Sequence, residues 1–289
     1  MEIKEISESE WGKILGKSKY NNYFQLPLFL NLSAKHFKLK NRYLEIKIKE
    51  TNYYFSLQEN KAYIGYSSFI GYGGVFSDKL FPFDLNLKIK KEVEKKYMIR
   101  IERITIFPQN IFLYPNLVPQ ATRYSAIVPI RKTMIDQERN MHKKTRTAAR
   151  YAFKHGILVR KIKKVDLDIF YSFYKETMNR VNSSYLTPKD FFSDLIDMKY
   201  TLFLGAFDNS MLVAGSVFFY YKDAMYYWWN SSNEIGRNLS ANYAIIFEAL
   251  NFCIDNKFAF LDMASSHSST IEQPKLKWGA KLMPLIIIE

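Results

Sequence analysis

The alternation of apolar and polar positions predicts short strands in the first part of the chain. β-Branched and aromatic residues form short runs, and the polar residues between these runs indicate turns. The predicted strands cover residues 43–48, 53–57, 62–67, 99–106 and 124–128. A basic amphipathic stretch over residues 85–94 predicts a helix among them. We therefore expect the N-terminal part of the protein to be rich in strands.

Helical and strand periods alternate in the rest of the chain. A long helix is expected over residues 136–156, because Gly156 stands where a glycine commonly ends a helix. Other helices are predicted over 166–180, from Thr187 and over 242–255, and strands over 201–207, 212–220, 224–229, 258–263 and 285–288. Both halves contain a meander of two or three strands. The fold class is therefore α/β (α+β), with one lobe over residues 1–133 and a second over 134–289.

Composition limits the class of protein and its compartment. Hydrophobic residues make up 48% and aromatic residues 17% of the 289 residues, which is enough for a full core and excludes collagen-like and disordered chains. The single cysteine, Cys253, excludes a disulfide framework, and no Cys/His spacing indicates a zinc site. The start has no signal-peptide pattern, and no apolar run approaches the ~20 residues that span a bilayer. We expect a cytoplasmic protein without a transmembrane segment or a metal.

The net charge of +14 favours an anionic partner: a nucleic acid, a nucleotide cofactor, a phosphorylated sugar or an acidic membrane surface. Ten Lys/Arg and no Asp or Glu lie between Arg139 and Lys164. Five of the basic residues would share one face of the long helix: Arg139, Lys143, Arg146, Arg150 and Lys154. A solvated polar face is the alternative explanation. The absence of acidic residues at helical spacing argues against it.

Six segments resemble, in the same order, motifs of one acyltransferase family. They are residues 24–29 (FQLPLF), 69–74 (FIGYGG), 144–150 (KTRTAAR), 239–248 (LSANYAIIFE), 260–263 (FLDM) and 274–280 (PKLKWGA). The set resembles the Fem-type branch of the GNAT acyltransferase superfamily, which includes peptidoglycan-bridge aminoacyltransferases and CelD-like acetyltransferases. The resemblance implies two GNAT-like lobes, each a mixed, mostly antiparallel sheet flanked by helices, the second beginning with the basic helix.

The resemblance also implies an N-acyltransferase. The implied donor is an acyl-CoA, used as a co-substrate with no permanently bound cofactor. The implied acceptor is an amine on a cell-envelope or sugar precursor, which includes small molecules, nucleotide sugars and lipid-linked molecules. Two positions depart from the family pattern: Pro274 replaces an aromatic residue and Ala264 replaces a glycine. No long heptad segment is present, so the tRNA-associated coiled-coil arm of some bridge enzymes is missing.

Lys275 and Asp262 are the candidate catalytic residues. The resemblance places Lys275 beside the acyl carbonyl, where an ammonium stabilises an oxyanion, or beside a phosphate; a surface lysine is the alternative. Asp262 ends a buried strand and could orient or deprotonate the incoming amine, or could cap the polar loop that follows. His267, in that loop, is a candidate for substrate binding because histidine titrates near neutral pH. An exposed loop histidine is its alternative.

The segment before the helix at 242–255 is the candidate cofactor-binding loop. It stands where GNAT enzymes place R/Q-x-x-G-x-G/A, whose backbone N–H groups hold the pyrophosphate of coenzyme A at a helix N-terminus. Its predicted binding residues are Arg237, Leu239, Ser240, Ala241 and Asn242. A simple helix cap explains Ser240 and Asn242 equally well. The candidates for substrate binding are Arg146, Arg150, Tyr72, Trp228 and His267, and core packing is the alternative for the aromatic run 226–229.

Two other functions account for the same basic residues. In an aminoacyl-tRNA-dependent transferase, the basic helix would follow the phosphates of tRNA. In a non-catalytic nucleic-acid-binding protein, it would follow a polynucleotide without any chemistry. Polynucleotide binding should weaken steeply with salt, whereas coenzyme A binding should be less sensitive. Peripheral contact with a membrane is compatible with the charge in all of these cases.

Overall fold

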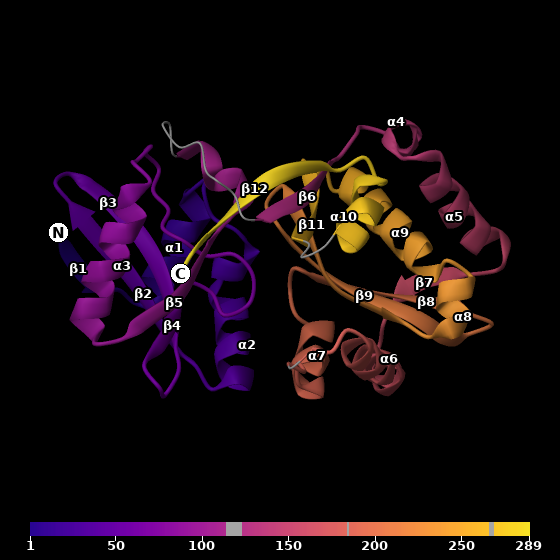
Figure 1. Ribbon diagram of the computed structural model, residues 1–289, viewed down its shortest axis with the longest axis horizontal. Helices are drawn as coiled ribbons and strands as arrows, with labels where there is room; N and C mark the ends of the chain where they lie inside the picture. The colour runs from indigo at the N-terminus through magenta and orange to yellow at the C-terminus, as the bar shows by residue number, and fades with distance from the viewer. Residues whose placement is uncertain (114–122, 184, 266–268) are drawn as a thin grey trace. The chain divides into compact units, whose positions relative to one another are not determined.

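The computed structural model describes residues 1–113, 123–183, 185–265 and 269–289. It divides into two compact units, shown as a ribbon in Figure 1: unit 1 is Met1–Tyr124 with Met283–Glu289, and unit 2 is Ser125–Leu282. This division differs from the expected boundary after residue 133. The last strand belongs largely to unit 1 because its backbone pairs there, with Ile286 opposite Ile106.

Unit 1 contains a sheet in the order β1-β2-β3-β4-β5-β12, in which β4 and β5 pair in parallel and the other strand pairs of the described residues are antiparallel. Its elements are β1 (Glu2–Glu5), α1 (Glu8–Lys17), α2 (Pro27–Phe37), β2 (Lys40–Ile48), β3 (Thr51–Glu59), β4 (Ile64–Tyr66), α3 (Asp84–Tyr97), β5 (Arg100–Ile106) and β12 (Lys281–Ile288). Short 3-10 turns occupy Tyr23–Gln25 and Pro108–Leu113. Helices α1 and α2 were not expected, and the expected strands and α3 are present.

Helices cover both faces of the sheet in unit 1. On one face, Ile89 and Val93 of α3 pack in a buried cluster with Leu44 of β2. On the other face, the ring of Trp11 in α1 stacks on Tyr43, with centroids 5.3 Å apart. Successive strand residues point to opposite faces, so neighbouring residues of β2 contact different helix layers.

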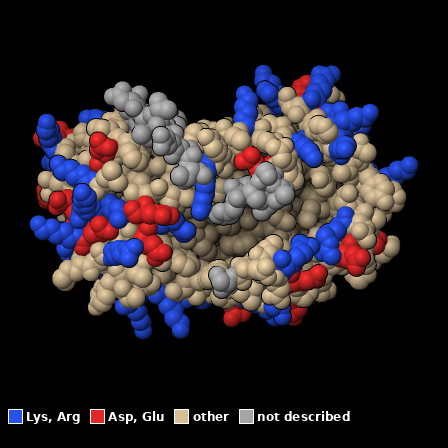
Figure 2. All heavy atoms as spheres, in the orientation of Figure 1, with Lys and Arg blue, Asp and Glu red and all other residues tan. Residues whose placement is uncertain are grey.

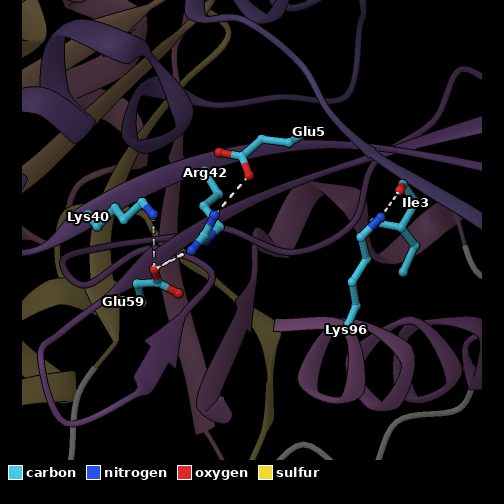
Figure 3. Close-up of polar contacts among 6 residues, drawn as sticks. All are labelled: Ile3, Glu5, Lys40, Arg42, Glu59 and Lys96. Atoms are coloured by element: carbon cyan, nitrogen blue, oxygen red, sulfur yellow. Dashed lines mark hydrogen bonds and ion pairs between the residues drawn. The ribbon is translucent and has the colours of Figure 1, made fainter. Parts of the chain in front are cut away.

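A cluster of charged side chains ties the edge strands of unit 1 together (Figure 3). Arg42 of β2 donates to Glu5 of β1 at 2.9 Å and to Glu59 of β3 at 2.8 Å. In the same view, the ammonium of Lys96 in α3 donates to the carbonyl of Ile3. These contacts join three strands and a helix, and they give this cluster a structural role.

Unit 2 contains a sheet in the order β6-β11-β10-β9-β8-β7, in which β10 and β11 pair in parallel and the other strand pairs among the described residues are antiparallel. Its elements are β6 (Arg123–Pro129), α4 (Met134–Asn140), α5 (Lys143–Lys154), β7 (Leu158–Lys161), a 3-10 turn (Lys164–Asp166), α6 (Leu167–Arg180), α7 (Lys189–Ile196), β8 (Thr201–Asp208), β9 (Met211–Tyr221), β10 (Ala224–Ser232), α8 (Glu234–Asn238), α9 (Ala241–Asp255), β11 (Phe260–Ser265) and α10 (Ser269–Leu276). Helices α6 and α7 cover one face, and α5 and α9 lie over the other (Figure 1). The expected fold class is confirmed in both units.

The expected single helix over 136–156 is wrong, because the structure breaks it into α4 and α5. Met141 and His142 have extended backbones between the two helices, and Met141 is buried in the core of unit 2. His142 caps α5 by accepting from the N–H of Lys144 at 3.2 Å. The expected end is confirmed, since Gly156 follows α5 with a φ of 82°. The five basic residues therefore do not share one helix face.

The face of the unit 2 sheet under α6 requires a glycine at position 215. A Cβ built at Gly215 of β9 would lie 2.5 Å from the buried ring of Phe170. We expect Gly215→Ala to lower the free energy of unfolding by about 1–3 kcal/mol, because the ring has no room to retreat. Urea unfolding would measure the change. Gly12→Ala in α1 is the control: a Cβ there meets nothing within 4 Å, so it should leave stability unchanged or raise it.

Candidate functional site

A cavity of about 230 Å³ lies in unit 2, between the first turns of α9 and the segment that contains α10. Its lining residues come from β10, α9, β11 and the region of α10: Tyr227, Asn230, Asn242, Tyr243, Ile246, Met263, Pro274, Lys275 and Trp278. Most of the aromatic and aliphatic members are buried, whereas Asn230 and Pro274 are exposed. The cavity is therefore closed by apolar side chains and open where these two residues lie.

A β-bulge in β10 decides which side chains of the aromatic run reach the cavity. The pairing of β10 with β9 shifts register between Tyr227 and Trp229. An extra residue in one strand changes the alternation of its side chains, so Tyr227 and Asn230 lie on the same face. Trp229 packs against Phe191 of α7, with centroids 5.6 Å apart. Within the aromatic run, Tyr227 thus lines the cavity, whereas Trp229 packs against α7.

Lys275 contributes the only ammonium among the residues that line the cavity. Its Nζ donates to the carbonyl oxygens of Ala264 at 3.0 Å and Ser265 at 3.1 Å. Burial lowers the pKa of Lys275 to about 8, although Asp262 and Glu272 oppose the shift by attracting its charge. An ammonium has three N–H donors, so one is left for a substrate atom. The Lys275 ammonium is therefore partly buried and held by backbone carbonyls.

Asp262 holds the backbone that positions Lys275. Its Oδ1 accepts from the hydroxyl of Ser125 at 2.6 Å and from the N–H of Ala264 at 2.7 Å, and the residue is 1% exposed. Ala264 has a φ of 59°, a conformation that favours glycine, which is the residue that the family pattern has there. Asp262 does not line the cavity. Its geometry is that of an aspartate capping the loop, and its charge attracts the Lys275 ammonium.

A second hollow lies on the other side of the first turn of α9. It is lined by residues of α5 and by the residue before α9: Lys143, Lys144, Thr147, Ala148, Tyr151 and Ser240. Ser240 adopts a φ of 55° and caps α9 without a side-chain hydrogen bond. Both lysines are exposed, and the first turn of α5 carries no acidic residue. Helix N-termini and lysines attract phosphate groups, so this hollow suits an anion.

The predicted cofactor-binding residues separate into different environments. Ser240 lines the basic hollow, whereas Asn242 lines the cavity beside Lys275. Arg237 instead donates to the carbonyl of Ser232 at 2.9 Å. Leu239 and Ala241 have structural roles: Leu239 packs against the core of unit 2, and Ala241 is fully buried within it.

The two arginines predicted to bind substrate have acceptors from α4. Arg146 donates to the carbonyl oxygens of Glu138 at 2.8 Å and Met141 at 2.7 Å, and Arg150 forms an ion pair with Glu138. Both still line an open hollow with Arg139. Figure 2 shows Lys and Arg gathered over α4 and α5. Sequence spacing missed the pairing because Glu138 belongs to a separate helix.

The remaining predicted residues lie elsewhere. Tyr72 belongs to unit 1, is 2% exposed and packs against Phe24 and Phe107. Trp228 sits at the bulge and does not line the cavity, which Tyr227 does. His267 lies outside the described residues. Cys253 is buried in the core, as expected.

Sequence reasoning missed the walls of the cavity. Tyr243 and Ile246 fall within the helix expected over 242–255, and Trp278 within the motif segment 274–280. The helical spacing of Tyr243 and Ile246 is their sequence signal, and it does not distinguish a cavity wall from an ordinary buried core. No cluster of three or more metal-ligating residues occurs in the described part of the chain. Among the helices of those same residues, none is long and apolar enough to cross a membrane.

Comparisons with known proteins show which family model the sequence of unit 2 matches and which solved structures have a similar fold. The model of the FemAB_like family, described as peptidoglycan biosynthesis/recognition, matches residues 126–267, which lie in unit 2. No curated protein matches the chain by sequence. The crystal structure of FemX has 12% sequence identity and a TM-score of 0.71, and the comparison covers 98% of this chain and 95% of that chain.

Two further solved structures have the same fold across their length. The structure of L-PGS from Bacillus licheniformis has 10% identity and a TM-score of 0.60, and covers 98% of this chain and 92% of that chain. A tandem GNAT protein from the clavulanic acid biosynthesis pathway has 6% identity and a TM-score of 0.57, with 100% and 98% covered. At these identities the likeness is one of fold.

Proposed function

We propose that the chain is a Fem-type member of the GNAT-like acyltransferases and that it transfers an acyl or aminoacyl group to an amine used in cell-envelope synthesis. The observation that carries the proposal is the Lys275 ammonium, held by two carbonyls on the wall of a largely apolar cavity that is open at one end. A non-catalytic nucleic-acid-binding protein has no need of such a cavity.

The reaction requires few protein groups. The nitrogen of a neutral amine forms a bond to the acyl carbon, and the carbonyl oxygen becomes an oxyanion. Collapse of this intermediate breaks the bond from carbon to the thioester sulfur or ester oxygen, and the amine proton leaves with the carrier. Lys275 stabilises the oxyanion through its remaining N–H, and the cavity fixes the acyl group. Asp262 positions Lys275 through the Ala264 carbonyl.

The basic hollow supports an anionic carrier for the acyl group. The first turn of α9 lies between the cavity, which Asn242 lines, and the hollow, which Ser240 lines. A donor with its acyl group in the cavity would bring its phosphates to Lys143 and Lys144. Acyl-CoA has this arrangement of an acyl group and phosphates, and it is the donor we propose.

An aminoacyl-tRNA is the second candidate donor, and one observation favours it. The Oδ1 atom of Asn242 is buried without a hydrogen-bond partner, and the Nδ2 atom donates only weakly to Ser232, at 3.4 Å. A buried amide oxygen without a donor is costly. The α-ammonium of an aminoacyl group would supply that donor, whereas an acetyl group would not.

Product mass would test the function and separate the donors. The protein is incubated with acetyl-CoA or with aminoacyl-tRNA, and with an amine-bearing nucleotide sugar or a lysine-containing peptide as acceptor. A mass increase of the acceptor with either donor supports the transferase, and the donor that works identifies the carrier. Absence of any transfer across the donor and acceptor combinations, in protein shown to be folded, would reject the proposal.

Loss of the two lysines of the hollow should weaken donor binding. We expect Lys143→Ala/Lys144→Ala to raise KM for the donor about tenfold, equivalent to about 1.4 kcal/mol of binding free energy, with kcat nearly unchanged. The effect should shrink as salt screens the charges. The double variant Lys154→Ala/Lys161→Ala removes the same charge outside the hollow. An equal rise in KM in that control would show that only net charge matters.

A further inference from the structure

The cavity beside Lys275 has an apolar end. Trp278, Met263 and Ile246 are 2%, 2% and 6% exposed and close it. The indole of Trp278 lies flat against the ring of Tyr243, with centroids 5.7 Å apart and an interplanar angle of 27°. A group that enters past Asn230 therefore meets a rigid wall of aromatic and aliphatic side chains.

The volume of the cavity indicates the size of the group that it can take. At about 230 Å³, it exceeds the ~150 Å³ of an apolar protein cavity that stays dry and binds benzene. An acetyl methyl group would leave most of this space empty, and unfilled apolar space forfeits contacts. A branched aliphatic group or one aromatic ring would fill it.

The charge of the lining residues limits the chemistry of the group. Among the described lining residues Lys275 is the only charged one, and the other polar groups belong to Tyr227, Tyr243, Asn230, Asn242 and the indole N–H of Trp278. A cationic side group would face the Lys275 ammonium, and the described lining residues include no carboxylate to compensate it. The Asn230 and Asn242 amides can hydrogen-bond to polar atoms near the acyl carbon, whereas the end closed by Trp278, Met263 and Ile246 has no charged group and is mostly apolar.

We propose that this cavity is the acyl-selectivity pocket, and that the transferred group carries an uncharged apolar side group about the size of benzene. This inference rests on the proposed transferase function and names the substrate class of that site. Bulky apolar acyl groups, such as phenylacetyl, or phenylalanyl from an aminoacyl ester, should be preferred over acetyl or glycyl. Lysyl groups should be rejected. Ile246 is the specificity-determining residue, because it closes the cavity from α9.

Substitution of Ile246 tests the proposal in transfer assays. Donor pairs that differ only in the acyl group are compared: phenylacetyl-CoA with acetyl-CoA, and phenylalanyl-tRNA with glycyl-tRNA. The wild type should favour the bulky donor about tenfold or more in kcat/KM. Ile246→Phe, which fills the cavity, should abolish or reverse that preference, and Ile246→Ala should keep it. The control is Ile245→Ala, because Ile245 is fully buried on the same helix but does not line the cavity.

A binding measurement separates failure of the pocket from failure of the enzyme. Phenylacetamide, an uncharged probe without a carrier, should raise the melting temperature of the wild type and of Ile245→Ala, and not that of Ile246→Phe. If this pattern holds but no acyl group is transferred from any donor, the result supports the pocket and rejects the proposed reaction. If transfer occurs with the same donor preference in the wild type and Ile246→Phe, the pocket is overturned. The pocket is overturned equally if phenylacetamide protects Ile246→Phe as well as the wild type.

Discussion

Lys275→Ala should lower kcat by about 10²-fold or more while changing KM little, because the lost N–H would stabilise charge that exists only in the transition state. Steady-state kinetics at saturating donor would measure the loss. Lys275→Arg should rescue activity only in part, since a planar guanidinium cannot replace an ammonium held between two carbonyls.

The pH dependence of kcat reports the charge state of the same lysine. Its pKa is lowered by burial to about 8, so the cationic form dominates below that pH. If the cation is the active form, kcat should fall as the pH rises through about 8. The assay needs an acceptor amine that is already neutral at pH 7, because a titrating acceptor would raise the rate over the same range.

Two other outcomes would assign Lys275 a different role. A raised KM with kcat intact, and full rescue by arginine, would show that it holds a phosphate of the donor or acceptor. Unchanged kinetics in Lys275→Ala would show that the C-terminal motif does not contribute to the reaction. A kcat that rises through pH 8 would identify a neutral lysine as the active form, contrary to the oxyanion role.

Asp262→Ala should lower the free energy of unfolding by about 3 kcal/mol. The change leaves the Ser125 hydroxyl and the Ala264 N–H without their acceptor and removes a carboxylate that attracts the Lys275 ammonium. Urea unfolding would measure the loss. Asp255→Ala at the exposed end of α9 is the control, and it should change stability by no more than about 0.5 kcal/mol.

Asp262→Asn distinguishes a positioning role from a purely structural one. The amide oxygen can still accept from Ser125 and Ala264, but the attraction that raises the pKa of Lys275 is gone. The pKa should therefore fall further below 8, and the pH at which kcat declines should fall with it. A pH profile identical to that of the wild type, in a folded Asp262→Asn variant, would contradict the positioning role.

The elements of unit 2 could largely be predicted because their signals are local. Strands β8 to β10 and helices α6 and α9 follow from periods of about 2 and 3.6 residues within their own segments. In unit 1, α1 and α2 were missed. The buried Trp11 of α1, for example, contacts the distant residues Tyr43 and Phe76. Tertiary packing outweighs local propensity there.

The candidate site was likewise predictable where its signals are local and unpredictable where they are not. The sequence by itself determined that Lys275 is a candidate catalytic residue and that a segment rich in basic residues runs from Arg139 to Lys164. It also determined that α9 begins near Asn242. Only the tertiary structure decided that the basic helix breaks at Met141 and that the bulge in β10 turns Tyr227 toward the cavity. The reason is separation along the chain: Ser125 reaches Asp262 across 137 positions, and no local period encodes such a contact. Burial among residues that are distant in sequence, such as Tyr227 and Tyr243, lowers the pKa of Lys275, a property that its sequence neighbours alone do not determine.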